Sequence, residues 1–309
     1  MSEFDWIDRY LRPLATAPGA HNLKNDVATL SDSVGATIAT MDTIVEGVHF
    51  LSSDPIETVG KKLLRVNVSD ILCKGALPKD ALLSVALPND FTEESFATFC
   101  RGLGADLVEW GVTLLGGDTV RTPGPLTLTI TLTGTCLAAG PVERSGAQPG
   151  DVLCVTGEIG HGGLGLTDAK AGRPSTHADH YRVPRLPGVE VADLVACFAS
   201  ASIDVSDGLL SDTALIAEQS RVAVSLQLSD VPYAAPVSTA EDAINLATSG
   251  DDYQTLFTVP PSDLEACLER ADESGLSVTV IGQVRTGSEV ELRFQDEIFE
   301  TPTRSGYSH

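Results

Sequence analysis

LTLTITLTGTC, residues 126–136, carries the clearest structural signal in this chain. Leucine and isoleucine alternate with threonine along it, so an extended backbone would have one apolar face and one face of hydroxyl groups. A repeat of two residues is typical of a β-strand that packs on a core with one face only. The segment therefore predicts a sheet with one covered face.

The sequence upstream of this strand alternates between strand and helix patterns. Asp54 and Pro55 supply an N-cap residue and a proline at the first helical position, which predicts a helix that runs towards Asp70. Around that helix we expect strands at 34–41, 80–87 and 111–115 and a second helix at 93–109.

Residues 138–150 (AAGPVERSGAQPG) concentrate glycine, proline and alanine, and we place a domain boundary there. A chain of 309 residues is long enough for two cores, which gives an N-terminal domain at 1–138 and a C-terminal domain at 139–309. In the second domain we expect strands at 151–156, 222–228, 253–259, 276–284 and 289–294 and helices at 188–199, 209–219 and 262–274. Both domains are therefore predicted to have a mixed α/β fold.

The formal net charge is −23, from 43 acidic and 20 basic residues. This surplus disfavours nucleic acids and anionic membranes as partners, and a protein of this charge that binds phosphates needs local cations. The six cysteines form no C-x-x-C pair and several lie in apolar runs, so we expect reduced core residues. No apolar run reaches membrane-spanning length and the acidic start does not resemble a signal peptide, so we expect a cytoplasmic protein.

Aspartates recur at the ends of apolar segments. Taken alone, any one of them is more often an N-cap or turn residue, but their recurrence points to one crevice beyond the carboxyl ends of strands. The aspartates concerned are Asp26, Asp42, Asp70, Asp118, Asp204 and Asp207.

Carboxylates that converge repel one another. Two of them about 4 Å apart repel by roughly 4 kcal/mol at an effective dielectric constant of about 20, so protonation or bound cations must relieve the cost. Oxygen ligands without neighbouring cysteine or histidine pairs suit Mg²⁺, which binds one or two carboxylates together with substrate phosphates. The pattern predicts metal-dependent nucleotide chemistry, and the lack of a G-x-x-x-x-G-K-[ST] segment excludes a P-loop protein.

Six segments stand out as motifs: DTIVEGVHF (42–50), NVSD (67–70), LGGDT (115–119), RSGAQPGD (144–151), IDVSDGL (203–209) and GDDYQTLFT (250–258). They occur in the order found in thiamine-monophosphate kinases, a family of the aminoimidazole ribonucleotide synthetase superfamily, which the chain resembles over nearly its whole length. VEGVHF separates these kinases from their relatives. The resemblance implies ATP-dependent phosphorylation of thiamine monophosphate to thiamine diphosphate by direct transfer, in a homodimer whose N-terminal domains pair.

The resemblance also implies roles for single residues. Several Mg²⁺ ions would be held by Asp26, Thr40, the carbonyl group of Met41, Asp42, Asp70, Asp118, Asp204 and Asp207, and the catalytic set would be Asp42, Asp70, Asp118 and Asp204. ATP would contact Gly117, Asp118, Arg144 and Ser206. Thiamine monophosphate would contact His49 and Asp251. Outside these motifs, His49 would more often be a core histidine, Arg144 could cap the linker, and the segment Gly116-Gly117-Asp118 is weak evidence by itself.

Four positions depart from the family pattern. Asn25 replaces a carboxylate, Met41 replaces a hydroxyl, and Asp251 is one methylene shorter than the usual glutamate. Lys74 lies near Asp70 in the sequence, and we expect it to point to solvent. These departures leave two alternatives open, namely another ATP-using member of the superfamily and a degenerate nucleotide-binding protein without turnover.

Overall fold

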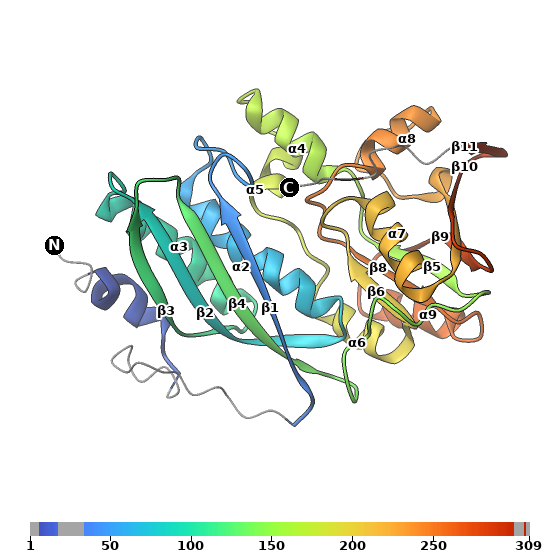
Figure 1. Cartoon of the computed structure of the whole chain (residues 1–309), viewed down its shortest axis with the longest axis horizontal. Helices are drawn as coiled ribbons and strands as arrows, with labels where there is room; N and C mark the ends of the chain where they lie inside the picture. Colours follow the sequence, from blue (N-terminus) through green and yellow to red (C-terminus); the bar gives the residue numbers. More distant parts are fainter. Residues whose placement is uncertain (1–5, 18–33, 300–305, 307–309) are drawn as a thin grey trace. The chain divides into compact units, whose positions relative to one another are not determined.

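The computed structural model describes residues 6–17, 34–299 and 306. Contacts within the chain divide it into two compact units (Figure 1). The first unit comprises Met1–Ile71 and Leu77–Thr135, and the second comprises Leu72–Ala76 and Cys136–His309. The functional roles expected for the two domains stay predictions, because this division concerns contacts alone.

A four-stranded sheet with helices on one face forms the first unit. Its strands lie in the order β1, β4, β2, β3. In chain order the elements are two short helical turns (Ile7–Leu11 and Arg12–Leu14), β1 (Thr37–Val45), α2 (Ile56–Leu72), β2 (Ala76–Pro88), α3 (Glu93–Glu109), β3 (Thr113–Thr122) and β4 (Thr127–Cys136). Both α2 and α3 lie against the same face of the sheet (Figure 1).

The two faces of β4 differ as the alternation predicts. Leu128, Ile130 and Leu132 are buried, while the threonines between them are half-buried on the opposite face. Gly134 lies so close to α2 that an added Cβ would meet the side chain of Ile71 at 2.5 Å. The aliphatic face of this strand therefore packs on the helices, and the prediction of a sheet with one covered face is confirmed.

Two strands extend further than the ranges 34–41 and 111–115 that we expect. Asp42 and Asp118 lie inside β1 and β3, so the prediction that these carboxylates follow strand ends is wrong. Strand β1 continues because Asp42 pairs with Ile130 of β4, and such pairing satisfies the backbone whatever the polarity of the side chain.

A seven-stranded mixed sheet forms the centre of the second unit, in the order β11, β10, β7, β9, β5, β8, β6. Its strands are β5 (Val152–Thr156), β6 (Ala201–Asp204), β7 (Ala223–Gln227), β8 (Thr255–Val259), β9 (Val278–Arg285), β10 (Val290–Phe294) and β11 (Glu297–Phe299). The helices are α4 (His161–Lys170), α5 (Thr176–Arg182), α6 (Glu190–Phe198), α7 (Leu209–Ser220), a short turn η4 (Leu228–Asp230), α8 (Ala240–Ala247) and α9 (Leu264–Glu273). Strands β7 and β10 pair in parallel, and the other pairs in this sheet are antiparallel.

Both faces of the seven-stranded sheet are covered. Leu153 of β5 belongs to one apolar cluster with Ile216 of α7, whereas the next residue, Cys154, belongs to a second cluster with Leu194 of α6. Successive residues of a strand point to opposite faces, so the sheet lies between two apolar layers. The mixed α/β fold predicted from the sequence is confirmed in each unit.

Helices α5 and α8 are not predicted from the sequence, because both are too short to show a helical period. The expected strand at 253–259 begins only at Thr255. Before it, Asp251 and Tyr253 have positive φ values of 67° and 51°, so the backbone turns there.

All six cysteines are free, and five of them are buried. Cys197 is exposed, so the expectation of a core position fails for that residue. Within residues 6–17, 34–299 and 306, no helix combines the length and apolar character that crossing a membrane requires.

Candidate active site

Two carboxylates of the first unit meet between β1 and α2. Thr40 and Asp42 share the face of β1 that points at α2, because alternate residues of a strand lie on one side. The hydroxyl of Thr40 donates to Oδ2 of Asp70, near the C-terminal end of α2, at 2.5 Å. The structure therefore brings together three residues predicted to bind metal, although Asp70 lies in a helix rather than after a strand.

Asn67 fixes the main chain at Asp42. It is fully buried on α2, its Oδ1 accepts the N–H of Asp42 at 3.0 Å, and its Nδ2 donates to the carbonyl of Leu63 at 2.9 Å. Both ends of the amide are used, so its orientation is set by the network. Asn67 is the first residue of the NVSD motif, but the sequence alone predicts no role for it.

The electrostatics of this pair suit a bound cation. Burial, the charge of Asp70 and a hydrogen bond with Asp70 together raise the pKa of Asp42 to about 7. A divalent cation relieves such repulsion, and two carboxylates with a hydroxyl are oxygen ligands of the kind that Mg²⁺ binds. No group of three or more His, Cys, Asp or Glu side chains in the described part of the chain is arranged to hold a metal alone. Water and phosphate oxygens would therefore have to complete the coordination.

Two other predicted metal ligands of the N-terminal half are not part of this pair. Asp26, with its neighbour Asn25, lies outside the described residues. The side chain of Met41 is 64% exposed and points away from α2, on the opposite face of β1 from Asp42. Only the carbonyl group of Met41 is left for the role that we predict.

Asp118 does not reach Asp42 within one chain. Strands β1 and β3 are the two edges of the sheet, so three strand spacings separate them, roughly 14 Å. Asp118 is paired with Ser84 of β2, and both are exposed on the face away from the helices. Asp118 and Asp42 therefore lie at opposite edges and on opposite faces of the same sheet.

Gly117 has a structural reason to be glycine. A Cβ at this position would lie 1.7 Å from the carbonyl oxygen of Leu83 on the neighbouring strand β2. At Gly116 the nearest atom would be 3.7 Å away, in the side chain of Leu82, which is an ordinary contact. The close approach of β2 therefore explains why residue 117 is a glycine, whether or not a phosphate binds there. The ATP contact of Gly117 stays a prediction.

His49 lies in a tight loop directly after β1. Its Nδ1 accepts the N–H of Val45 at 3.0 Å, and its carbonyl accepts from Nζ of the buried Lys62 at 3.0 Å. Because Nδ1 is an acceptor, the neutral ring carries its proton on Nε2, which can donate to a ligand. The sequence alone does not predict that Lys62 is a neighbour of this histidine.

The second unit gathers acidic residues where β6 leads into α7. Asp204 ends β6, as its position after an apolar segment predicts, and Asp207 lies in the following loop. Asp212, in the first turn of α7, is buried, and burial with the charges of Asp204 and Asp207 raises its pKa to about 8. Sequence reasoning missed Asp212, whose only signal is its place five residues after Asp207 at the start of a helix.

The turn that contains Asp251 packs on the loop after β6. The N–H of Asp251 donates to the carbonyl of Ser206 at 2.9 Å, and the hydroxyl of Tyr253 donates to Oδ1 of Asp251 at 3.0 Å. The second unit therefore brings Asp251, a predicted thiamine contact, next to Ser206, a predicted ATP contact.

Arg144 is not brought to Ser206. Its carbonyl accepts from the hydroxyl of Ser220 at 3.2 Å, at the C-terminal end of α7, whereas Ser206 precedes the other end of that helix. A helix of 12 residues is roughly 18 Å long. Lys74 donates to the carbonyl of Ser202, so the expectation that it points to solvent is wrong.

Comparisons with known proteins first define the class. Residues 24–137 match the family model for the N-terminal domain of AIR synthase related proteins, and residues 148–295 match the model for the C-terminal domain. The chain thus has the two domains of an AIR synthase related protein.

Individual relatives narrow this class. A thiamine-monophosphate kinase of Caulobacter vibrioides is 37% identical over 322 residues, covering 100% of this chain and 91% of the relative. The thiamine-monophosphate kinase structure from Stenotrophomonas maltophilia matches with a TM-score of 0.80 and 30% identity, over 97% of this chain and 98% of that one. A structure of AaThiL complexed with AMPPCP and TMP matches with a TM-score of 0.76 and 27% identity, over 99% and 97% of the two chains. This chain belongs to the thiamine-monophosphate kinase family.

Proposed function

We propose that this chain transfers the γ-phosphate of ATP to thiamine monophosphate and releases ADP and thiamine diphosphate. A terminal phosphate oxygen of thiamine monophosphate bonds to the γ-phosphorus while the bond from that phosphorus to the β–γ bridging oxygen breaks. Family membership supports this reaction, as does the relative solved with AMPPCP and TMP. The observation that carries the proposal is the pair Asp42 and Asp70, held with Thr40 between β1 and α2.

The metal part of the proposal assigns several Mg²⁺ ions to the acidic residues of both units. Bound Mg²⁺ would neutralise the phosphate oxygens as charge moves onto ADP. Asp42 and Asp70 would hold it in the first unit, and Asp204 and Asp207 in the second. Asp26, Asp118 and the carbonyl of Met41 would complete the set implied by the family resemblance. The contribution of Asn67 is positional, because it holds the backbone of Asp42 in place.

Substrate contacts follow the same family pattern. His49 would donate from Nε2 to thiamine monophosphate, since Nδ1 is already an acceptor and the neutral ring then carries its proton on Nε2. Asp251 would contact the same substrate, and its carboxylate is oriented by the hydroxyl of Tyr253. Gly117, Arg144 and Ser206 would contact ATP. We also propose a cytoplasmic location, where ATP is available.

The proposed active form is a homodimer that pairs through the uncovered face and edges of the four-stranded sheet. That face carries Met41, Leu82 and Val120, which are 64%, 38% and 45% exposed. An edge strand also presents unpaired backbone groups, which pairing with a second copy would cover. If the β3 edge of one copy meets the β1 edge of the other, one strand spacing rather than three separates the strand of Asp118 from the second copy's strand that carries Asp42.

A product assay distinguishes this function from the two alternatives, another ATP-using reaction and nucleotide binding without turnover. Purified protein is incubated with Mg²⁺, ATP and either thiamine monophosphate, thiamine or a pyrimidine phosphate, and the products are separated by chromatography. We expect equal amounts of ADP and thiamine diphosphate with thiamine monophosphate only. ATP binding without product from any acceptor would contradict the proposal, and ADP formed without thiamine diphosphate would favour a different reaction.

A further inference from the structure

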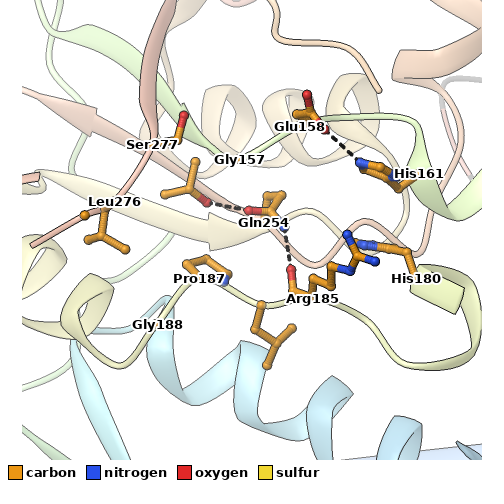
Figure 2. A pocket seen from close by; sticks show the side chains of 13 residues that line it. Gly157, Glu158, His161, His180, Arg185, Pro187, Gly188, Gln254, Leu276 and Ser277 are labelled. Atoms are coloured by element: carbon orange, nitrogen blue, oxygen red, sulfur yellow. Dashed lines mark hydrogen bonds and ion pairs between the residues drawn. The ribbon is translucent and has the colours of Figure 1, made fainter. Parts of the chain in front are cut away.

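The second unit contains a pocket of about 310 Å³ that none of the metal, ATP or thiamine residues proposed above lines. Figure 2 shows its wall, which comes from the start of α4, from α5, from the loop after α5 and from the segment before β9. The residues that line the pocket include Glu158, His161, His180, Arg185, Pro187 and Leu276. At the share of volume that water takes in the liquid, this space equals roughly ten water molecules. It is therefore large enough for a small organic molecule.

His180 lacks a hydrogen-bond partner in this wall. It is 1% exposed, and no described residue forms a hydrogen bond of ordinary geometry with either ring nitrogen, although the backbone of Asp251 and Asp252 is close enough to raise its pKa slightly. Buried polar groups are nearly always hydrogen-bonded, so an unpartnered imidazole beside a pocket indicates that a bound molecule supplies the partner.

Arg185 adds an available cation next to this imidazole (Figure 2). Its backbone is fixed, because its carbonyl accepts from Nε2 of Gln254 at 2.9 Å. Its side chain is exposed and forms no ion pair with the residues that the structure describes. A guanidinium fixed at its base and free at its tip can bind a phosphate or a carboxylate with two parallel hydrogen bonds.

A second histidine and a carboxylate lie beside His180 in this wall. His161 stacks on His180 with ring centroids 4.8 Å apart, and its Nε2 lies 2.9 Å from Oε2 of Glu158. Burial first, and then the electrostatic effects of His161 and Arg185, lower the pKa of His180 to about 4, whereas the backbone of Asp251 and Asp252 partly opposes the shift, so this ring is neutral near pH 7. An anion bound between these groups would oppose the effect of Arg185 and raise the pKa of His180. Arg185 is therefore the cation that could attract an anion to this side of the pocket, and the neutral ring of His180 can donate one hydrogen bond.

We propose that this pocket binds a small organic phosphate monoester through side chains that the proposed kinase reaction does not use. The phosphate lies between the guanidinium of Arg185 and the ring of His180, and Pro187 and Leu276 contact the organic part. A phosphate is favoured over a carboxylate because its three terminal oxygens point in different directions, so two can accept from Arg185 while the third accepts from His180, whereas both oxygens of a carboxylate lie in one plane with the guanidinium. Inorganic phosphate alone would leave the apolar side of the pocket uncovered.

The test is a titration followed by the ring-proton NMR signals of His180 and His161, assigned with a His180→Gln variant. Phenyl phosphate, inorganic phosphate and benzoate are added separately, without Mg²⁺, ATP or thiamine monophosphate, so the outcome does not depend on the proposed kinase reaction. We expect phenyl phosphate to shift both signals to saturation and to bind more tightly than either other probe. Arg185→Gln should weaken binding about tenfold or more, because a charge-assisted hydrogen-bond pair is lost. Arg285→Gln, a second exposed arginine that does not line the pocket, should leave binding unchanged.

Three results would overturn the proposal. The first is that phenyl phosphate leaves the His180 signals unmoved. The second is that Arg185→Gln and Arg285→Gln bind it equally well, which would place the anion elsewhere. The third is that benzoate binds as tightly as phenyl phosphate, which would identify a carboxylate site instead.

Discussion

At the scale of single residues, Lys62 links α2 to the loop that holds His49. It is 2% exposed, and its Nζ donates to the carbonyl of His49 at 3.0 Å. We expect Lys62→Met to raise the KM for thiamine monophosphate about tenfold with a smaller change in kcat. The reason is that a hydrogen bond from a charged group contributes about 1.5 to 3 kcal/mol, and its loss frees the loop. Steady-state kinetics with thiamine monophosphate as the varied substrate measure the effect.

Lys61→Met is the matched control for this variant. Lys61 lies beside Lys62 on α2 but pairs with Asp106, at 3.8 Å. The variant Lys61→Met should therefore leave the KM for thiamine monophosphate unchanged. An unchanged KM in Lys62→Met as well would mean that Lys62 supports the fold rather than the substrate loop.

His180 gives a prediction about stability and pH. Its pKa is lowered from 6.5 to about 4 in the folded protein, so as pH falls the unfolded chain takes up the proton first. Folding stability is therefore lost as pH falls from about 6.5 towards 4, by up to about 3 kcal/mol from this residue. Urea unfolding across this range should show a weaker pH dependence for His180→Gln than for the wild type. Equal slopes for the two proteins would refute the assignment.

At the scale of secondary-structure elements, Gly117 is a position in β3 that has no room for a side chain against β2. The Cβ of alanine at this position would lie 1.7 Å from the carbonyl of Leu83, so the strands would have to separate. We expect Gly117→Ala to lower the free energy of unfolding by about 2 kcal/mol or more without any nucleotide present, which urea denaturation measures. Gly116→Ala should have a small effect, since its nearest contact would be 3.7 Å away. If Gly117→Ala is as stable as the wild type but binds ATP more weakly, this residue is a glycine because of the phosphate contact and not because of the packing of β2.

The elements themselves could largely be predicted from the sequence, because their signals are local. The alternation in β4 and the helix at Glu93–Glu109 are found where the pattern places them. The lengths of β1 and β3 could not be predicted, because pairing with other strands continues the backbone past Asp42 and Asp118. That pairing depends on residues distant in the sequence, and the hydrophobic periodicity of one segment carries no information about its pairing partners.

The candidate site shows the same limit. The NVSD and DTIVEGVHF motifs point to Asp42 and Asp70, and the structure brings those two residues together. The sequence does not predict roles for three further residues, Asn67, Lys62 and Asp212. Asn67 and Lys62 act through hydrogen bonds to residues of another segment, and the pKa of Asp212 is raised by burial and by neighbouring charges. The expected convergence of all aspartates at strand ends failed within the first unit, because Asp118 lies on the other face of the sheet.

At the scale of the whole molecule, the position of Asp118 makes the proposed dimer testable. Asp42→Asn and Asp118→Asn should each be inactive alone. If Asp118 serves the site of a second copy, mixing the two variants under conditions that exchange subunits should restore about a quarter of wild-type activity, since half of the dimers are mixed and each has one intact site. Activity assays before and after exchange, with the dimer followed by light scattering, measure this. A mixture that stays inactive despite subunit exchange would rule out a shared site.

The most direct test of the account is a single-turnover measurement on Asp42→Asn. Wild-type protein with saturating Mg²⁺, γ-labelled ATP and thiamine monophosphate should transfer the label to thiamine diphosphate. Asp42→Asn should do so at least about a hundredfold more slowly, because one charge of the metal-binding pair is lost. Asp90→Asn, the same substitution at an exposed turn, should match the wild type. Transfer of the label by Asp42→Asn at the wild-type rate would contradict the claim that this carboxylate pair serves phosphoryl transfer.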